Sequence, residues 1–174
     1  MPLETIDILK KYKNGNVFVE TGTYKGDGVQ LALDAGFEKV HSMEIYEPLY
    51  LQSSKRFANN YNVKLWRGDT SINFGDMISC IDEPVTFWLD SHISGCDSSY
   101  NPECTAPLMR ELEEIAKHHI KTHTILMDDR RFFDVWGCPV EKIKDLILTT
   151  INPNYEFCFE DGYQPDDILV AYIP

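Results

Sequence analysis

The sequence alternates short runs of β-branched and aromatic residues with longer stretches of helical periodicity, and this alternation constrains the fold more than any other feature. Such alternation is typical of a parallel sheet whose strands are joined by crossover helices. Strands are expected over residues 16–20, 39–44, 63–67, 85–89 and 124–127, and helices over residues 27–35, 48–59, 72–81, 106–119 and 139–150. The pattern predicts an α/β protein.

The end of the chain departs from this alternation. Residues 155–160 and 168–173 are two strand-like runs with no helical segment between them, only the turn-rich residues 161–165. They are expected to form an antiparallel hairpin at one edge of a mostly parallel, seven-stranded sheet. Because 174 residues suit one domain of ordinary size, residues 1–174 are expected to form a single domain.

Composition excludes several classes of protein. An apolar share of 43% suffices for a core, and no apolar run approaches the roughly 20 residues of a membrane helix. The net charge of −12 disfavours nucleic acid and anionic membranes as partners. Residues 1–15 lack the apolar stretch of a secretory signal, so a cytoplasmic location is expected. The odd number of cysteines, without a C-x-x-C pair, favours reduced thiols at Cys80, Cys96, Cys104, Cys138 and Cys158.

Polar residues end the expected strands, where ligands bind in open α/β sheets. The first strand runs into Glu20-Thr21-Gly22-Thr23-Tyr24-Lys25-Gly26, whose glycines permit a tight turn and close approach of a ligand. The second strand ends in Glu44, an acid suited to a ribose diol, and the third in Gly68-Asp69. This glycine spacing is not the G-x-G-x-x-G of dinucleotide enzymes.

The acid-x-Gly-x-x-x-Gly motif, with an acid closing the second strand, resembles the class I S-adenosylmethionine (SAM)-dependent methyltransferases. The resemblance covers nearly the whole chain and implies a three-layer Rossmann-like sandwich that binds SAM. It also implies a set of cofactor-binding residues: Glu20, Thr21, Gly22, Thr23, Tyr24, Gly26, Glu44, Ile45, Gly68, Asp69, Thr70 and Asp90.

Tyr24 stands where most of that superfamily has a middle glycine, and this variant looks like the catechol-type, metal-dependent O-methyltransferases. In that family an Asp after the fourth strand and an Asp-Asn pair after the fifth hold a divalent cation. The matching residues are Asp90, Asp128 and Asp129, which implies a site for Mg, Mn or Ca. The chain also looks like small bacterial and viral proteins with W-L-D-x-H and a late Asp-Asp, often considered sugar or glycan methyltransferases.

Two residue types depart from the catechol pattern. Asp129 replaces the asparagine, and Ser91-His92 stands where the family's lysine base would follow Asp90. His92 is accordingly expected to be the base, with Asp90 as its catalytic partner, unless it is an ordinary loop histidine. The expected reaction is SAM-dependent methylation of a hydroxyl of a sugar, glycan or other small diol.

Two interpretations stay open for several side chains that follow Asp129 in the sequence. Arg130 and Arg131 either pair with the aspartates or hold an anionic acceptor, and Phe132, Phe133 and Trp136 either pack or form a stacking wall for the acceptor. The histidines at 118, 119 and 123 are expected to be solvated. The loop 92–105 is expected to roof an open site, with help from a second subunit if the chain is a homo-oligomer.

Two alternatives stay open at the level of function. An NAD-dependent oxidoreductase would also place an acid such as Glu44 on a ribose, although the glycine spacing is against it. A non-catalytic SAM-binding domain would carry the same cofactor motif. A methyltransferase acting on protein or nucleic acid is disfavoured by the net charge and by the absence of an N-P-P-[YF] motif.

Overall fold

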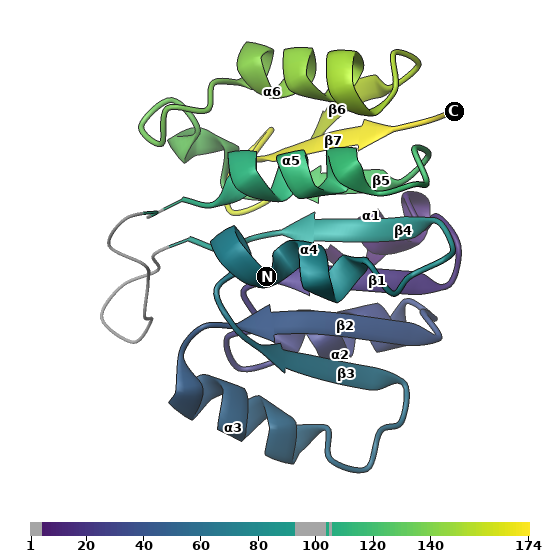
Figure 1. Ribbon diagram of the computed structural model, residues 1–174, viewed down its shortest axis with the longest axis vertical. Coiled ribbons are helices and arrows are strands. Elements are labelled where there is room, and N and C mark those ends of the chain that lie inside the picture. Colours follow the sequence, from purple (N-terminus) through teal and green to yellow (C-terminus); the bar gives the residue numbers. More distant parts are fainter. Residues whose placement is uncertain (1–4, 93–103, 105) are drawn as a thin grey trace.

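A seven-stranded sheet in the order β3-β2-β1-β4-β5-β7-β6 forms the centre of the computed structural model, which describes residues 5–92, 104 and 106–174 (Figure 1). The strands β1 to β5 are parallel, and β7 runs antiparallel to both β5 and β6. Their bounds are Val17–Thr21 for β1, Lys39–Glu44 for β2, Val63–Arg67 for β3, Val85–Leu89 for β4, Thr124–Met127 for β5, Glu156–Glu160 for β6 and Ile168–Tyr172 for β7. The predicted sheet and its C-terminal hairpin are confirmed.

Helices cover both faces of the sheet (Figure 1). They are α1 Thr5–Lys11, α2 Asp27–Asp34, α3 Glu47–Arg56, α4 Thr70–Ile78, α5 Leu108–Lys117 and α6 Val140–Leu146. Residues of β1 alternate between the two faces: Val17 and Val19 pack against the α4, α5 and α6 side, whereas Phe18 packs against α1 and α2. Because both faces are covered, the central strands are apolar throughout, as parallel strands usually are.

The helices differ from the sequence expectation in two places. Helix α1 was not expected, because it is a short, lysine-rich segment held by packing of Leu9, which is fully buried, and not by its own helix propensity. The expected helix 139–150 is α6 followed by a π-helical segment, Ile147–Ile151. Each remaining helix lies within a few residues of its predicted range.

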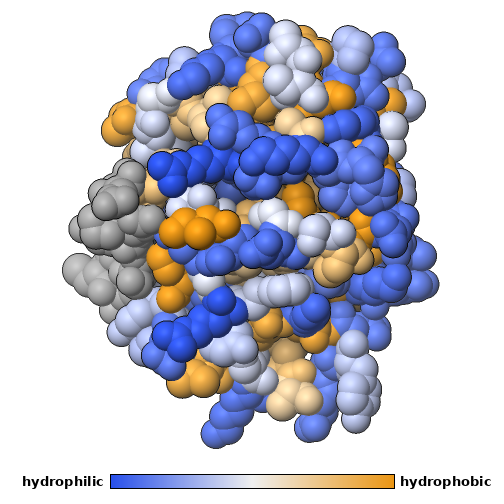
Figure 2. All heavy atoms as spheres, viewed as in Figure 1, coloured by the Kyte–Doolittle hydropathy of each residue, from blue (hydrophilic) through white to orange (hydrophobic). Residues whose placement is uncertain are grey.

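The outer surface agrees with the acidic, polar composition. On the face shown in Figure 2, hydrophobic residues are scattered among hydrophilic ones. Within residues 5–92, 104 and 106–174, no helix has the length and apolar character needed to cross a membrane. The cysteines at 80, 104, 138 and 158 are free thiols, whereas Cys96 lies outside the described residues.

The expectation that the three neighbouring histidines are solvated is wrong for two of them. His123 is fully buried and His118 is nearly so, at the amino ends of β4 and β5. The Val85 amide donates to His123 Nδ1 (3.1 Å), which places the proton of the neutral ring on Nε2, facing His118 Nδ1 at 3.1 Å. His118 Nε2 in turn donates to the Ile81 carbonyl (3.0 Å). The two histidine rings thus serve as hydrogen-bond partners for the Val85 amide and the Ile81 carbonyl.

The buried pair of His118 and His123 makes the free energy of unfolding depend on pH. Burial, reinforced by the neighbouring His118, lowers the pKa of His123 to about 3, against about 6.5 in an unfolded chain. The contribution of neutral His123 to the free energy of unfolding is therefore fully present above about pH 6.5. It falls by up to about 1.4 kcal/mol per pH unit as the pH drops from 6.5 towards 3. We expect His123→Phe to be less stable than the parent at pH 7.5 but to lose less stability between pH 7 and 4.5, in urea unfolding. His119→Ala, an exposed control, should keep the parental slope, and an equally steep slope for His123→Phe would contradict this account.

Candidate active site at the carboxyl edge of the sheet

The polar residues singled out in the sequence gather at the carboxyl ends of β1, β2, β4 and β5. The sheet order reverses between β1 and β4, so the crossover helices leave these two strands toward opposite faces and open a crevice between them. Because β7 is antiparallel, its first residues reach the same edge. All three non-glycine residues with a positive φ in the described part of the chain, Tyr24, Asp129 and Asp166, lie at this edge. Backbone strain is thus concentrated where the polar residues meet.

The loop after β1 approaches β4 closely. Gly22 has a φ of 82°, and a Cβ atom at this position would lie 2.7 Å from the Asp90 carbonyl oxygen. Gly26, also with a positive φ, precedes α2, and its Cβ would overlap the ring of Phe57. Only glycine fits these two positions, so the motif read from the sequence has a steric cause.

Glu44 holds this loop in place. Its Oε2 accepts a hydrogen bond from the Tyr24 amide and its Oε1 accepts one from the Tyr46 amide, each at 2.8 Å. Burial raises the pKa of Glu44, and these backbone hydrogen bonds act in the opposite direction. Each carboxylate oxygen has a second lone pair, so the carboxylate can accept further hydrogen bonds while it positions the strained residue Tyr24.

A second acid lies at the base of the crevice. Glu20 is almost fully buried and accepts a hydrogen bond from Ser42 (2.6 Å), whose hydroxyl also meets that of Thr23 at 2.6 Å. Burial raises the pKa of Glu20 to about 8, with a further contribution from the charge of Asp90. Glu20 is therefore an acid for which a positively charged neighbour would be favourable.

The residues after β3 border the same crevice. Gly68 donates its amide to the Glu44 carbonyl (3.0 Å), and Asp69 caps α4 by accepting from the Ser71 amide (2.8 Å). Thr70 is buried and donates to the Ser91 hydroxyl at 3.0 Å. The ends of β2, β3 and β4 are thus connected by hydrogen bonds.

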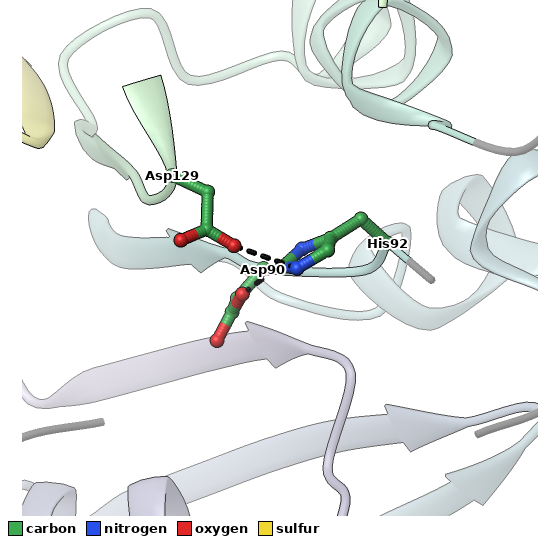
Figure 3. A group of neighbouring side chains, drawn as sticks. All are labelled: Asp90, His92 and Asp129. Carbon is green, nitrogen blue, oxygen red and sulfur yellow. Dashed lines mark ion pairs between the residues drawn. The ribbon is translucent and has the colours of Figure 1, made fainter. Parts of the chain in front are cut away.

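His92 lies between two carboxylates (Figure 3). Its Nε2 is 2.6 Å from Asp129 Oδ2 and its Nδ1 is 3.3 Å from Asp90 Oδ1. Burial disfavours a charged imidazole, but the hydrogen bonds and charges of Asp129 and Asp90 outweigh it and raise the pKa of His92 to about 10. In this arrangement His92 carries a proton at neutral pH.

Asp129 also contacts Arg131, at 2.5 Å from Nη2 to Oδ1. Burial alone would raise the pKa of Asp129, but His92 and Arg131 hold it below its ordinary value. Arg131 forms a second ion pair with Asp167, a fully buried acid just before β7. This favours the first of the two interpretations of the arginines: Arg131 pairs with the aspartates.

Asp128 is less well compensated. Burial and the charges of Asp90 and Asp129 raise its pKa to about 7, and its Oδ1 accepts only the Asp129 amide (2.8 Å) among the hydrogen bonds within the described residues. Asp128 therefore lies near enough to Asp90 and Asp129 for their charges to act on it, and the predicted metal set of these three acids stays a prediction.

The donor set suits a divalent cation. Ligand atoms of Asp90, His92 and Asp129 lie within 4.8 Å of one another, and so do those of Asp128, Asp129 and Asp167. Carboxylate oxygens with one imidazole nitrogen are appropriate for Mg²⁺ or Mn²⁺. A cation here would relieve the repulsion that raises the pKa of Asp128.

Sequence reasoning missed two buried acids. Asp167 could have been noticed because an antiparallel last strand begins at the carboxyl edge of the others. Glu111 could have been noticed because it lies on the apolar stripe of α5, between Leu108 and Leu112.

A small, open hollow lies beside these groups and is lined in part by Asp90, Ser91, His92, Glu111, Asp128 and Trp136. The Trp136 ring lies 5.0 Å from the His92 ring and 5.6 Å from that of Phe132, which is 40% exposed. Phe133, in contrast, is buried and only packs. The predicted roof, residues 93–103 and 105, lies outside the described residues.

No family model matches this sequence, and no curated protein matches it either. Solved structures are similar in fold. A Staphylococcus aureus protein assigned as a caffeoyl-CoA O-methyltransferase matches with a TM-score of 0.69 and 13% identity, over 100% of this chain and 85% of that chain. A Streptococcus mutans protein assigned as a methyltransferase, in complex with S-adenosylhomocysteine (SAH), gives 0.67 and 11% over 99% and 98%. A Clostridium thermocellum protein assigned as an rRNA methylase gives 0.62 and 18% over 97% and 94%. The fold is therefore that of the class I SAM-dependent methyltransferases, as the sequence resemblance implies.

Proposed function

We propose that this chain, which has the class I methyltransferase fold, transfers a methyl group from SAM to a hydroxyl oxygen of a small acceptor, assisted by a divalent cation. The observation that carries the proposal is the meeting, at one sheet edge, of the glycine loop held by Glu44 with the cluster of Asp90, His92 and Asp129. The glycine loop with Glu44 suits the binding of a nucleoside, and the cluster of two acids and a histidine suits an acceptor that must lose a proton. A single domain of residues 1–174 would contain both.

The cofactor half of the site comprises the loop from Glu20 to Gly26 and the ends of β2 and β3. Glu44, with Ile45 beside it, would accept hydrogen bonds from the ribose hydroxyls. Gly68, Asp69 and Thr70 would flank the base. Glu20 and Asp90 would face the positive charges of the methionine part, which would be favourable for two neighbouring acids. The occurrence of SAH in the Streptococcus mutans structure of the same fold supports this choice of ligand.

Methyl transfer is an in-line displacement, in which the bond from the methyl carbon to sulfur breaks, its electron pair stays on sulfur, and a bond from carbon to the acceptor oxygen forms. The acceptor proton must go to a base, and His92 would receive it at Nε2 or Nδ1. Since both ring nitrogens face carboxylates, His92 must first release to solvent the proton that Asp90 and Asp129 stabilise, and the freed nitrogen can then accept the proton of the acceptor hydroxyl. The protein's own task is to align acceptor and methyl group in the hollow beside Trp136.

Asp90, Asp128 and Asp129 would hold the divalent cation. When bound, a cation of this kind lowers the pKa of a nearby hydroxyl and orients it. By neutralising Asp90 and Asp129 it would also lower the pKa of His92, so that the imidazole could accept a proton near neutral pH. Metal binding and the base function of His92 are therefore linked in this proposal.

A sugar, glycan or other small diol is the proposed acceptor class. Two hydroxyls on neighbouring carbons could bind one cation, and the rings of Trp136 and Phe132 offer a surface on which a neutral ring could stack. The net charge of −12 disfavours RNA, although some proteins of similar fold are assigned as rRNA methylases.

We expect Glu44→Ala to weaken SAH binding by about 1–3 kcal/mol, because it removes charge-assisted hydrogen bonds to the ribose and releases Tyr24. Isothermal titration calorimetry with SAH measures this. Glu47→Ala is the matched control, since Glu47 is exposed on the same segment and pairs only with Arg67 among the ion pairs of the described residues. Equal affinity of Glu44→Ala and the parent would exclude the ribose role.

A thermal-shift comparison of SAH with NAD tests the proposed function. The proposal predicts that SAH raises the melting temperature and NAD does not. Stabilisation by NAD alone would indicate an oxidoreductase. Stabilisation by SAH without methyl transfer to any hydroxyl acceptor in the presence of Mg²⁺ or Mn²⁺ would instead indicate a non-catalytic SAM-binding domain.

A further inference from the structure

Glu111 is a buried acid that the proposed reaction does not use. It lies in the first turns of α5, only 1% exposed, although α5 is otherwise a helix with an apolar buried side and a charged outer side. A carboxylate in such a position is costly unless hydrogen bonds compensate for its burial. Glu111 lies beside the hollow that Asp90 and His92 also line, so the hydrogen bonds that offset its burial involve residues of the candidate site.

Three hydroxyls surround this carboxylate. Ser91 donates to Glu111 Oε1 and accepts from Thr70 (3.0 Å), and the hydroxyls of Thr70 and Thr21 lie close enough to the carboxylate to favour its charged form against burial. Each hydroxyl comes from a different part of the site: Ser91 follows β4, Thr70 begins α4, and Thr21 ends β1. Glu111 therefore lies where these three segments meet, with Ser91 as its direct hydrogen-bond donor.

The same hydroxyls hold the segment that carries Asp90 and His92. The Asp90 amide donates to Thr21 Oγ1 at 3.1 Å, and Thr70 donates to Ser91 Oγ at 3.0 Å. Asp90 is thus anchored at Thr21, beside Glu111, and Ser91 is anchored between Thr70 and Glu111. His92 is the next residue, and its ring contacts both Asp90 and Asp129.

We propose that Glu111 is a positioning residue: through Ser91, Thr70 and Thr21 it holds the Asp90–Ser91–His92 segment in the arrangement that the methyl-transfer site requires. The inference deepens the proposed function and rests on it for its catalytic meaning. In this role Glu111 acts through the hydrogen-bonded hydroxyls and takes no part in the transfer of the methyl group or the proton. A glutamine at this position keeps an oxygen that accepts from Ser91, whereas an alanine leaves the Ser91 hydroxyl without this acceptor.

The test compares Glu111→Ala, Glu111→Gln and Ser91→Ala with Glu114→Ala, a partly exposed acid on the same helix that pairs with Lys117. Long-range ¹H–¹⁵N NMR of the imidazole rings in the full chain reports on His92, whose signals are assigned with His92→Asn. The buried pair of His118 and His123, at the opposite edge of the sheet, serves as an internal reporter of core integrity. SAH affinity is measured on each variant by calorimetry.

The proposal predicts that Glu111→Ala and Ser91→Ala shift or broaden the His92 signals and leave those of His118 and His123 unchanged. Glu111→Gln and Glu114→Ala should resemble the parent. Unchanged His92 signals in both Glu111→Ala and Ser91→Ala would overturn it, and so would equal disturbance of His92 and the buried pair. Ser91→Ala keeps the test decisive if Glu111→Ala does not fold. A parent protein that fails to bind SAH overturns the proposed function, while the NMR comparison still decides the positioning.

Discussion

Removal of divalent cations is expected to abolish methyl transfer, with a loss of more than about 10²-fold in turnover. Asp128 lies partly buried beside Asp90 and Asp129, and its burial together with the charges of these two acids raises its pKa. Without a cation, the acceptor hydroxyl would have to lose its proton beside several negative charges, which is unfavourable. The measurement is transfer of a labelled methyl group from SAM to a panel of diols, sugar and aryl, after exhaustive treatment with a chelator.

Adding Mg²⁺ or Mn²⁺ should restore this activity, and SAH binding should persist without the metal because Glu44 and the glycine loop do not contribute ligands. Asp128→Ala should lower turnover as chelation does, whereas Asp134→Ala, at an exposed acid nearby, should not. Full turnover by the metal-free protein would show that the acids are structural and that metal-assisted transfer does not apply.

His92→Ala is expected to lower turnover by about 10²–10⁴-fold, the usual range for losing a general base, with little change in SAH affinity. Because a base must be unprotonated, turnover should rise with pH through the pKa of His92. Asp129 and Asp90 raise that pKa to about 10 in the metal-free protein, so a cation that neutralises them should shift the rise to lower pH. Turnover is measured from pH 6 to 9 at saturating SAM and metal.

The matched control is His119→Ala, an exposed histidine outside the site, which should retain parental turnover. Turnover of His92→Ala within threefold of the parent across this pH range would remove His92 from the mechanism. In that case the rate should depend on the acidity of the metal and differ between Mg²⁺ and Mn²⁺.

The strands were predictable to within about a residue because β-branched and aromatic runs buried on both faces are the strongest local signal for parallel strands. Helix α1 was not predictable in this way. Its charged sequence carries little periodic signal, and what holds it is the tertiary packing of Leu9. The burial of His118 and His123 was missed for a similar reason: a histidine has no local pattern that distinguishes a solvated ring from one that replaces a backbone partner.

The candidate site was predictable where a residue ends a strand. Glu20, Glu44, Asp90 and Asp128 all follow this rule, since the ends of parallel strands meet at one edge. Side-chain pairing could not be predicted from position alone. The ion pair of Arg131 with Asp129 and the hydrogen bonds that gather at Glu111 depend on the relative placement of distant segments.

A crystal structure of the protein grown with SAH and Mn²⁺ tests the central claim most directly, because it locates both halves of the site at once. The account predicts SAH along the carboxyl edge, with its ribose hydroxyls on Glu44 and its sulfur facing the Asp90–His92 segment. An anomalous peak for manganese should lie among Asp90, Asp128 and Asp129. A crevice without SAH at saturating concentration, or manganese bound away from these acids, would contradict it.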